Sequence, residues 1–293
     1  GLGDVYKRQS QCKQNLARLK ADYNFDMEEI NAGSPQTTAV AEYNLAYTSE
    51  GLSNDGKMQL QPRIVSGALI VPQGLTMDKI KGVILYFNHT TYAPNEYGPE
   101  ANLKNSLSFP ALYALNGYIV IRPDGLGFGL DAGEMHPYIY PQVTVLNGIN
   151  MLRATKEALA KLGLNTTKPL NLIINGFSEG GFVSAWATRM IYQHSELLND
   201  SSMQLKLTVA ISGVYDFEKV QLPLEYSNLS TNPGKNIFRI ENQALAAISK
   251  PGLITYAVGS FLYYNPQYKC SDILEEHFCN FCQARRKSIP LIC

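Results

Sequence analysis

The chain has 293 residues, of which 45% are hydrophobic and 17% charged, and its 25 basic side chains balance 25 acidic ones to a net charge of zero. A chain of this length buries about three quarters of its extended surface, so a large core needs no disulfide or metal to be stable. The neutral balance argues against a nucleic-acid binder, which needs a positive surface, and the apolar runs are far shorter than the roughly 18 residues of a membrane span.

Strands are predicted in the first half of the chain. Residues 40–47 and 64–71 alternate or cluster as strands and would form an antiparallel pair across a turn-rich segment. Two short apolar runs follow, at 83–87 and 118–121, of the kind found in strands that are buried on both faces.

Helices alternate with strands in the second half. A helix ending at Gly163 is predicted because apolar residues recur at helical spacing: Val145, Ile149, Leu152, Leu159 and Leu162. A buried strand at 170–174, a helix at 180–193, a strand at 205–211 and a short helix at 242–248 follow. This βαβ alternation predicts an α/β fold, a mostly parallel sheet with helices on both faces and any site at the carboxyl ends of the strands.

One motif carries chemistry. Gly176-Phe177-Ser178-Glu179-Gly180 matches G-x-S-x-G and stands between a predicted strand and a predicted helix, as a nucleophile elbow requires. Such an elbow holds its serine in a strained turn above the sheet, and glycines on either side let the two backbones pass closely. The helix N-terminus favours negative charge at the same place. The alternative is a glycine-rich turn that holds an ordinary serine.

Four further segments strengthen the motif, and together they resemble the α/β-hydrolase superfamily, in its serine esterase and secretory-lipase-like branch. The resemblance covers about residues 43–216 and rests on VSGALIVPQG, NHTTYAP, IRPDGLGFG, NGFSEGG and ISGVYDF. It implies that Ser178 is the nucleophile and that the backbone N–H groups of Glu179 and Thr91 bind the oxyanion. Thr90 stands where the family usually has glycine, and His89 is expected to fix the loop by hydrogen bonding.

A serine nucleophile also needs a histidine base and a carboxylate that orients it. In this fold both follow the serine in the chain. Only two histidines do so: His194, at the far end of the helix that starts at the serine, and His277, in an amphipathic helical pattern. His277 and Asp216 are the candidates within the chain. The preferred explanation is a C-terminally truncated fragment, inactive by itself, whose acid and base lie beyond Cys293.

The predicted organisation has four parts. Residues 1–9 resemble a translated adapter and are expected to be non-native, although an ordinary polar N-terminus stays open as an alternative. Residues 10–233 form the hydrolase core, residues 234–283 a cap or lid, and residues 284–293 a doubtful tail. The tyrosines of the cap would either line an acyl pocket or pack on the cap's own core.

The sequence therefore predicts that the parent protein cleaves small-molecule carboxylic esters through an acyl-serine, with no cofactor and no metal. A prolyl-oligopeptidase-type serine peptidase and a non-catalytic binding protein on the same fold are the alternatives.

A dinucleotide site after residue 121 is disfavoured, because Leu130 stands where the third glycine belongs. Cys279 and Cys282 have CxxC spacing but no second half-site. A secreted or periplasmic location follows from the resemblance alone, and the oligomeric state is open.

Overall fold

The protein is described by a computed structural model that covers residues 2–7, 37, 39–92, 109–165, 168–199, 201–215, 253, 256–273 and 279. The chain divides into two compact units. The larger unit comprises Gly1–Gly51, Gln61–His136 and Pro141–Gly213, and the smaller unit comprises Leu52–Leu60, Pro137–Tyr140 and Val214–Cys293. The candidate site lies wholly in the larger unit.

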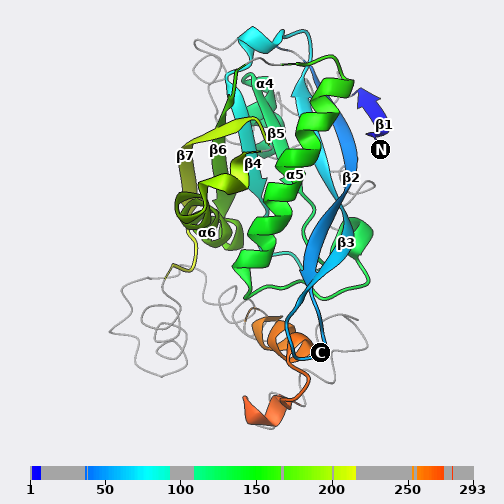
Figure 1. The fold of residues 1–293 in the computed structure, drawn as a ribbon, viewed down its shortest axis with the longest axis vertical. Helices are drawn as coiled ribbons and strands as arrows, with labels where there is room; N and C mark the ends of the chain where they lie inside the picture. Colours follow the sequence, from blue (N-terminus) through cyan, green and yellow to red (C-terminus); the bar gives the residue numbers. More distant parts are fainter. Residues whose placement is uncertain are drawn as a thin grey trace, which may run out of the picture. The chain divides into compact units, whose positions relative to one another are not determined.

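The larger unit is built on a sheet with the strand order β1-β2-β3-β5-β4-β6-β7 (Figure 1). β4 pairs in parallel with β5 on one side and with β6 on the other, and β6 pairs in parallel with β7. β3 runs antiparallel to β5, and β1 antiparallel to β2. The strands are β1 (Leu2–Lys7), β2 (Val40–Leu52), β3 (Leu60–Pro72), β4 (Gly82–Phe87), β5 (Tyr118–Pro123), β6 (Leu170–Phe177) and β7 (Met203–Ile211).

The predicted strands are all confirmed, with longer bounds than the apolar runs suggested. β2 and β3 are neighbours joined by a connection too short for a parallel crossover, so they form the expected antiparallel pair. β1 was not predicted, because it falls in the segment expected to be non-native. That origin stays a prediction, as do the bounds of the core and the cap. The predicted short helix at 242–248 lies outside the described residues.

Helices cover both faces of the sheet, as predicted, because successive strand residues point to opposite sides. Ile84 of β4 packs in one buried cluster with Ala114 of α4 (Phe109–Leu115). The next residue, Leu85, lies against Gly148 of α5 (Pro141–Lys161), which runs along the other face in Figure 1. α6 (Glu179–Gln193) packs beside α5 and against β6 and β7.

The end of α5 follows the prediction at Gly163. This glycine has a φ of 73°, in the left-handed region, where glycine carries no Cβ penalty. Its N–H donates to the Ala160 carbonyl at 3.1 Å, and the Leu164 N–H donates to the Leu159 carbonyl at 2.9 Å. These two bonds make a Schellman motif, which satisfies carbonyls that the last helical turn leaves open.

β7 is last in the strand order of the described residues, and it leaves large apolar side chains in solvent. Leu207 is 52% exposed and Ile211 is 43% exposed, and Phe177 on the neighbouring strand is 49% exposed. Strands of a parallel sheet are ordinarily covered on both faces. These side chains form an apolar surface at the β7 edge.

No helix among the described residues combines the length and hydrophobicity that crossing a bilayer requires.

The smaller unit has its own aromatic core. Tyr256 and Tyr264 lie in a helical stretch at 256–264 and are each 3% exposed. Their rings contact those of Tyr138 and Tyr140, at centroid distances of 4.9 and 5.6 Å. Tyr256 and Tyr264 are therefore buried against aromatic rings of the smaller unit. The cap to which these two tyrosines were assigned stays a prediction.

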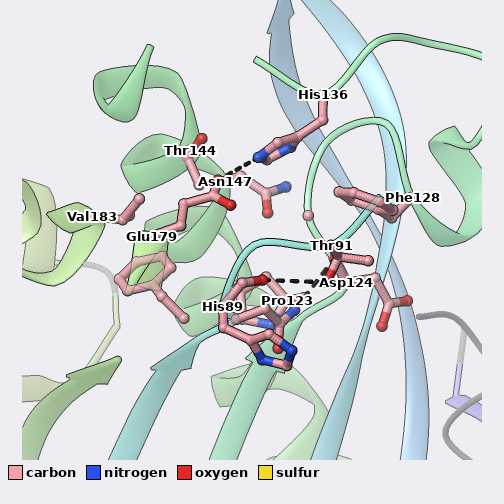
Figure 2. A pocket seen from close by; sticks show the side chains of 13 residues that line it. His89, Thr91, Pro123, Asp124, Phe128, His136, Thr144, Asn147, Glu179 and Val183 are labelled. Carbon is pink, nitrogen blue, oxygen red and sulfur yellow. Dashed lines mark hydrogen bonds and ion pairs between the residues drawn. The ribbon is translucent and has the colours of Figure 1, made fainter. Parts of the chain in front are cut away.

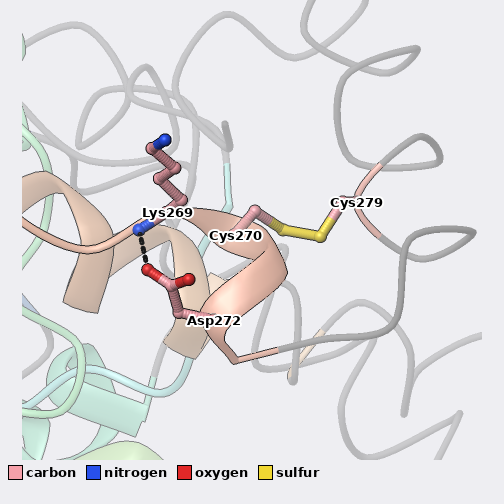
Figure 3. The surroundings of a disulfide bond; sticks show 4 residues. All are labelled: Lys269, Cys270, Asp272 and Cys279. Carbon is pink, nitrogen blue, oxygen red and sulfur yellow. Dashed lines mark hydrogen bonds between the residues drawn. A yellow bond between two sulfur atoms is a disulfide. The ribbon is translucent and has the colours of Figure 1, made fainter.

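A disulfide joins Cys270 to Cys279 in this unit (Figure 3). Cys270 begins a short 3₁₀ turn, which is capped by a hydrogen bond of 2.7 Å from the Lys269 N–H to the Asp272 carboxylate. Because Cys279 is in a disulfide, it has no free thiol for a CxxC site. Cys282, the other cysteine of that spacing, lies outside the described residues.

Breaking this disulfide is expected to destabilise the smaller unit. Closing a loop with a sequence separation of 9 residues restricts the unfolded chain by about 2–3 kcal/mol in the loop-entropy account. Cys270→Ser should lower the free energy of unfolding of this unit by that amount in calorimetry, and dithiothreitol should do the same to the wild type. Cys293→Ser is the matched control. Alkylation of Cys270 in the folded, unreduced protein would contradict the pairing.

Candidate functional site

The turn between β6 and α6 has the geometry of an elbow. Ser178 has φ 56° and ψ −118°, a left-handed conformation that costs a non-glycine residue about 1–3 kcal/mol. Its N–H donates to the Ile211 carbonyl at 2.9 Å, and its own carbonyl accepts from the Phe182 N–H at 3.1 Å. The neighbouring strand and the first turn of the helix therefore hold the serine in this conformation.

The glycines around Ser178 are required by close backbone contacts. A Cβ on Gly176 would lie 2.2 Å from the Gly180 carbonyl oxygen, and one on Gly180 would lie 2.2 Å from that of Phe87. Gly181 would bring its Cβ within 2.4 Å of the Ile211 carbonyl oxygen. Each neighbour is a backbone atom, so none of these contacts can be relieved by turning a side chain.

The loop after β4 lies beside this elbow, because the register pairs Phe87 with Gly176. The Asn88 side chain donates a hydrogen bond of 2.8 Å to the Pro123 carbonyl and so ties the loop to the end of β5. Thr91 is 2% exposed, and its hydroxyl donates to the His89 carbonyl at 3.2 Å. His89 thus contributes to the loop through its backbone, while the residue as a whole is exposed.

A pocket opens between this loop, α5 and the start of α6 (Figure 2). Its lining includes Thr91 and Glu179, the two residues whose N–H groups were expected to bind an oxyanion. It also includes His136, which the sequence analysis did not single out. The predicted residues Ser178, Glu179, Thr91, Gly176 and Gly180 therefore gather at the carboxyl ends of β4 and β6, where the strand order changes direction, as expected for a ligand site in such a sheet.

No protein-family model and no curated protein sequence matches the chain. Solved structures do match it. A Legionella pneumophila protein assigned as a hydrolase is 19% identical, with a TM-score of 0.68 over 96% of this chain and 66% of its own. The rice cell wall degrading esterase LipA from Xanthomonas oryzae is 20% identical, with a TM-score of 0.62 over 100% of this chain and 65% of its own.

The chain has the α/β-hydrolase fold. It spans just under two thirds of the length of either neighbour. In this fold a nucleophile elbow stands at the strand-to-helix turn that Ser178 occupies here. The likeness to these two structures is one of fold.

His194, the other histidine that follows the serine, does not join this group. His194 caps the far end of α6, a helix of 15 residues or about 22 Å from the elbow. It is exposed and pairs with Glu196 at 3.2 Å. His194 is therefore not a partner of Ser178, in agreement with its predicted position at the far end of the helix. Asp216 and His277 lie outside the described residues, and their roles stay predictions.

His136 makes two hydrogen bonds inside the pocket. Its Nδ1 lies 2.7 Å from the Leu126 carbonyl oxygen, and its Nε2 lies 2.5 Å from Oε1 of Glu179. Figure 2 shows the ring and the carboxylate facing each other across the pocket. The two side chains are only 6% and 8% exposed. No local pattern indicated this pair, because its members are separated by 43 positions in the chain.

The two contacts determine how protons are placed on the ring. A carbonyl oxygen only accepts, so Nδ1 carries a proton, and a carboxylate at Nε2 requires a second proton there. Burial by itself disfavours the charged ring, but the charge and hydrogen bond of Glu179, together with the Leu126 carbonyl, outweigh it and raise the pKa of His136. The raised pKa favours the protonated form of the buried ring beside Glu179.

This pair is expected to make stability depend on pH. Because the pKa of His136 is higher in the folded than in the unfolded chain, its contribution is complete below about pH 6.5, the ordinary histidine value, and is lost as pH rises through the folded pKa. Urea unfolding from pH 6 to 9 should show this decline. Glu179→Gln removes the charged partner and should flatten it. An unchanged decline in that variant would refute the assignment to this pair.

Proposed function

We propose that the parent protein of this chain is a serine hydrolase that cleaves carboxylic esters through an acyl-serine intermediate. The observation that carries the proposal is the left-handed backbone of Ser178, held by backbone contacts at three glycines beside the loop after β4. Local strain at a polar residue above a sheet is typical of functional sites, because the surrounding structure must offset its cost.

The proposed reaction begins when the Ser178 hydroxyl attacks the ester carbonyl carbon. The carbonyl oxygen then becomes an oxyanion, which the backbone N–H groups of Glu179 and Thr91 bind. The first bond of α6 runs from the Phe182 N–H to the Ser178 carbonyl, so the helix makes no use of the Glu179 N–H. The helix N-terminus adds a favourable field at the same point. Collapse of the intermediate expels the alcohol, and water then releases the acid from the serine.

A base must take the serine proton and an acid must orient that base. Among the described residues, His136 and His194 pair through their rings with Glu179 and Glu196 and not with Ser178. We propose that both groups come from the part of the parent protein beyond the core strands described here, with Asp216 and His277 as the candidates inside this chain. The apolar surface at the β7 edge supports a continuing sheet, because it lies where further strands and helices would cover it.

We propose esters rather than amides as substrates because LipA, which shares the fold, is an esterase. Substrate class is tested on the full-length parent protein with p-nitrophenyl esters of two to twelve carbons, beside aminoacyl-proline anilides. Ester turnover with no anilide turnover supports the esterase. Anilide turnover above ester turnover would establish the serine peptidase instead. If the folded protein turned over neither substrate, the non-catalytic binding protein would be established.

A further inference from the structure

Glu179 has two functions that conflict electrostatically unless its charge is compensated. Its backbone N–H is the proposed oxyanion donor, while its side chain is buried in the pocket beneath the same peptide. A carboxylate in a poorly solvated site raises the free energy of any second negative charge close by, since charges interact strongly at low dielectric. An oxyanion formed at the Glu179 N–H is such a charge.

We propose that His136 is a positioning residue for the oxyanion site: its imidazolium holds the Glu179 side chain and compensates the carboxylate charge beneath the peptide that binds the oxyanion. This inference rests on the proposed function. It assigns a role to a histidine that precedes the nucleophile in the chain and is not the base of the reaction.

The surroundings of His136 suit this role because they fix the ring from the side opposite Glu179. Its partner Leu126 belongs to the glycine-rich turn after β5, and the Phe128 ring of that turn lies 5.1 Å from the imidazole. A Cβ on Gly127 would come within 2.6 Å of the His136 backbone nitrogen. The turn, the imidazole and the Glu179 side chain thus form a continuous buried connection from β5 to the elbow.

Other ionisable groups also face this pair. Asp124 and His89 line the same pocket, and Tyr92 has its pKa raised by burial and, second, by the Glu179 charge. Asp131 and Glu134 belong to the segment that leads to His136; Asp131 accepts from the Gly127 N–H at 2.9 Å, and Glu134 pairs with Arg63 at 2.6 Å. A pH effect therefore counts as evidence for the pair only if substitution of the pair itself removes it.

The test compares His136→Asn, Glu179→Gln and the double variant in the full-length parent protein. If the imidazolium compensates charge, His136→Asn should lower kcat about 100-fold, the size of losing one oxyanion donor, with little change in KM. Adding Glu179→Gln should restore at least about tenfold of that loss, because the uncompensated carboxylate is then gone. The alkaline decline of kcat through the pKa of His136 should disappear in the double variant.

The matched control is the exposed pair formed by His194 and Glu196, whose side chains are 61% and 66% exposed. His194→Asn, Glu196→Gln and their double variant should leave kcat at the wild-type value. A folded double variant of His136 and Glu179 that is as slow as His136→Asn would overturn the proposal, since a packing defect is not repaired by a second substitution.

An NMR measurement gives a readout that does not depend on turnover. In ¹⁵N-histidine-labelled protein, both ring nitrogens of His136 should carry protons at neutral pH and should titrate above the range of a free histidine. A neutral ring at pH 7 would overturn the proposal even if the variants fail to fold. If the wild type is not acylated at Ser178, the proposed function fails and the oxyanion role with it, whereas the titration still reports the charged pair.

Discussion

Ser178→Ala is expected to abolish labelling of the full-length parent protein by a fluorophosphonate probe. It should also lower kcat for ester hydrolysis by roughly a millionfold, the loss that follows removal of a serine nucleophile. The reason is that no acyl-enzyme can form without the hydroxyl, so only substrate binding and the oxyanion donors remain. The measurement is mass spectrometry of the labelled peptide together with kcat on a p-nitrophenyl ester. Equal labelling of wild type and variant would remove Ser178 from the mechanism.

Ser178→Gly separates loss of chemistry from loss of fold. Glycine adopts a φ of 56° without a Cβ penalty, so the glycine variant should be more stable than the alanine variant by about 1–2 kcal/mol in urea unfolding. Both variants should be inactive. If the alanine variant were the more stable, the strain inferred at this turn would be wrong.

Gly180→Ala is expected to have the second largest effect. The added Cβ would lie 2.2 Å from the Phe87 carbonyl oxygen and 2.7 Å from that of Asn88, so α6 must move away from the end of β4. Overpacking of this kind costs about 1–3 kcal/mol and occasionally more. The movement displaces the Glu179 N–H from the loop after β4. We therefore expect a lower free energy of unfolding in urea and a loss of kcat of at least about 100-fold.

Gly133→Ala is the matched control for this substitution. A Cβ at Gly133 meets nothing within 4 Å, and its φ is not in the left-handed region. The variant should stay within about 0.5 kcal/mol of the wild type and keep its activity. A Gly180→Ala variant as stable as Gly133→Ala would show that the elbow tolerates a side chain, against the close packing described above.

The parts of the fold that were predictable are those whose signals are local. β4, β5 and β6 are short apolar runs bounded by polar or glycine-rich residues, and burial on both faces accounts for them directly. α4 was missed, because seven largely apolar residues fit a buried strand as well as a helix by periodicity alone. The break after α5 was predictable because Gly163 alone supplies the left-handed residue that ends the helix.

The same distinction applies to the candidate site. The sequence by itself determined the elbow, because the strand, Ser178, its glycines and the helix are consecutive, and the steric demand of the turn is met by those residues. Only the tertiary structure decided what surrounds it. The strand order β5-β4-β6 brings the ends of three strands together, so Asn88 reaches Pro123 and His136 reaches Glu179. The two contacts join residues that are 35 and 43 positions apart in the chain, so no local sequence pattern indicates them. Both contacts follow from the order of the strands, and the pairing of His136 with Glu179 also compensates a buried charge.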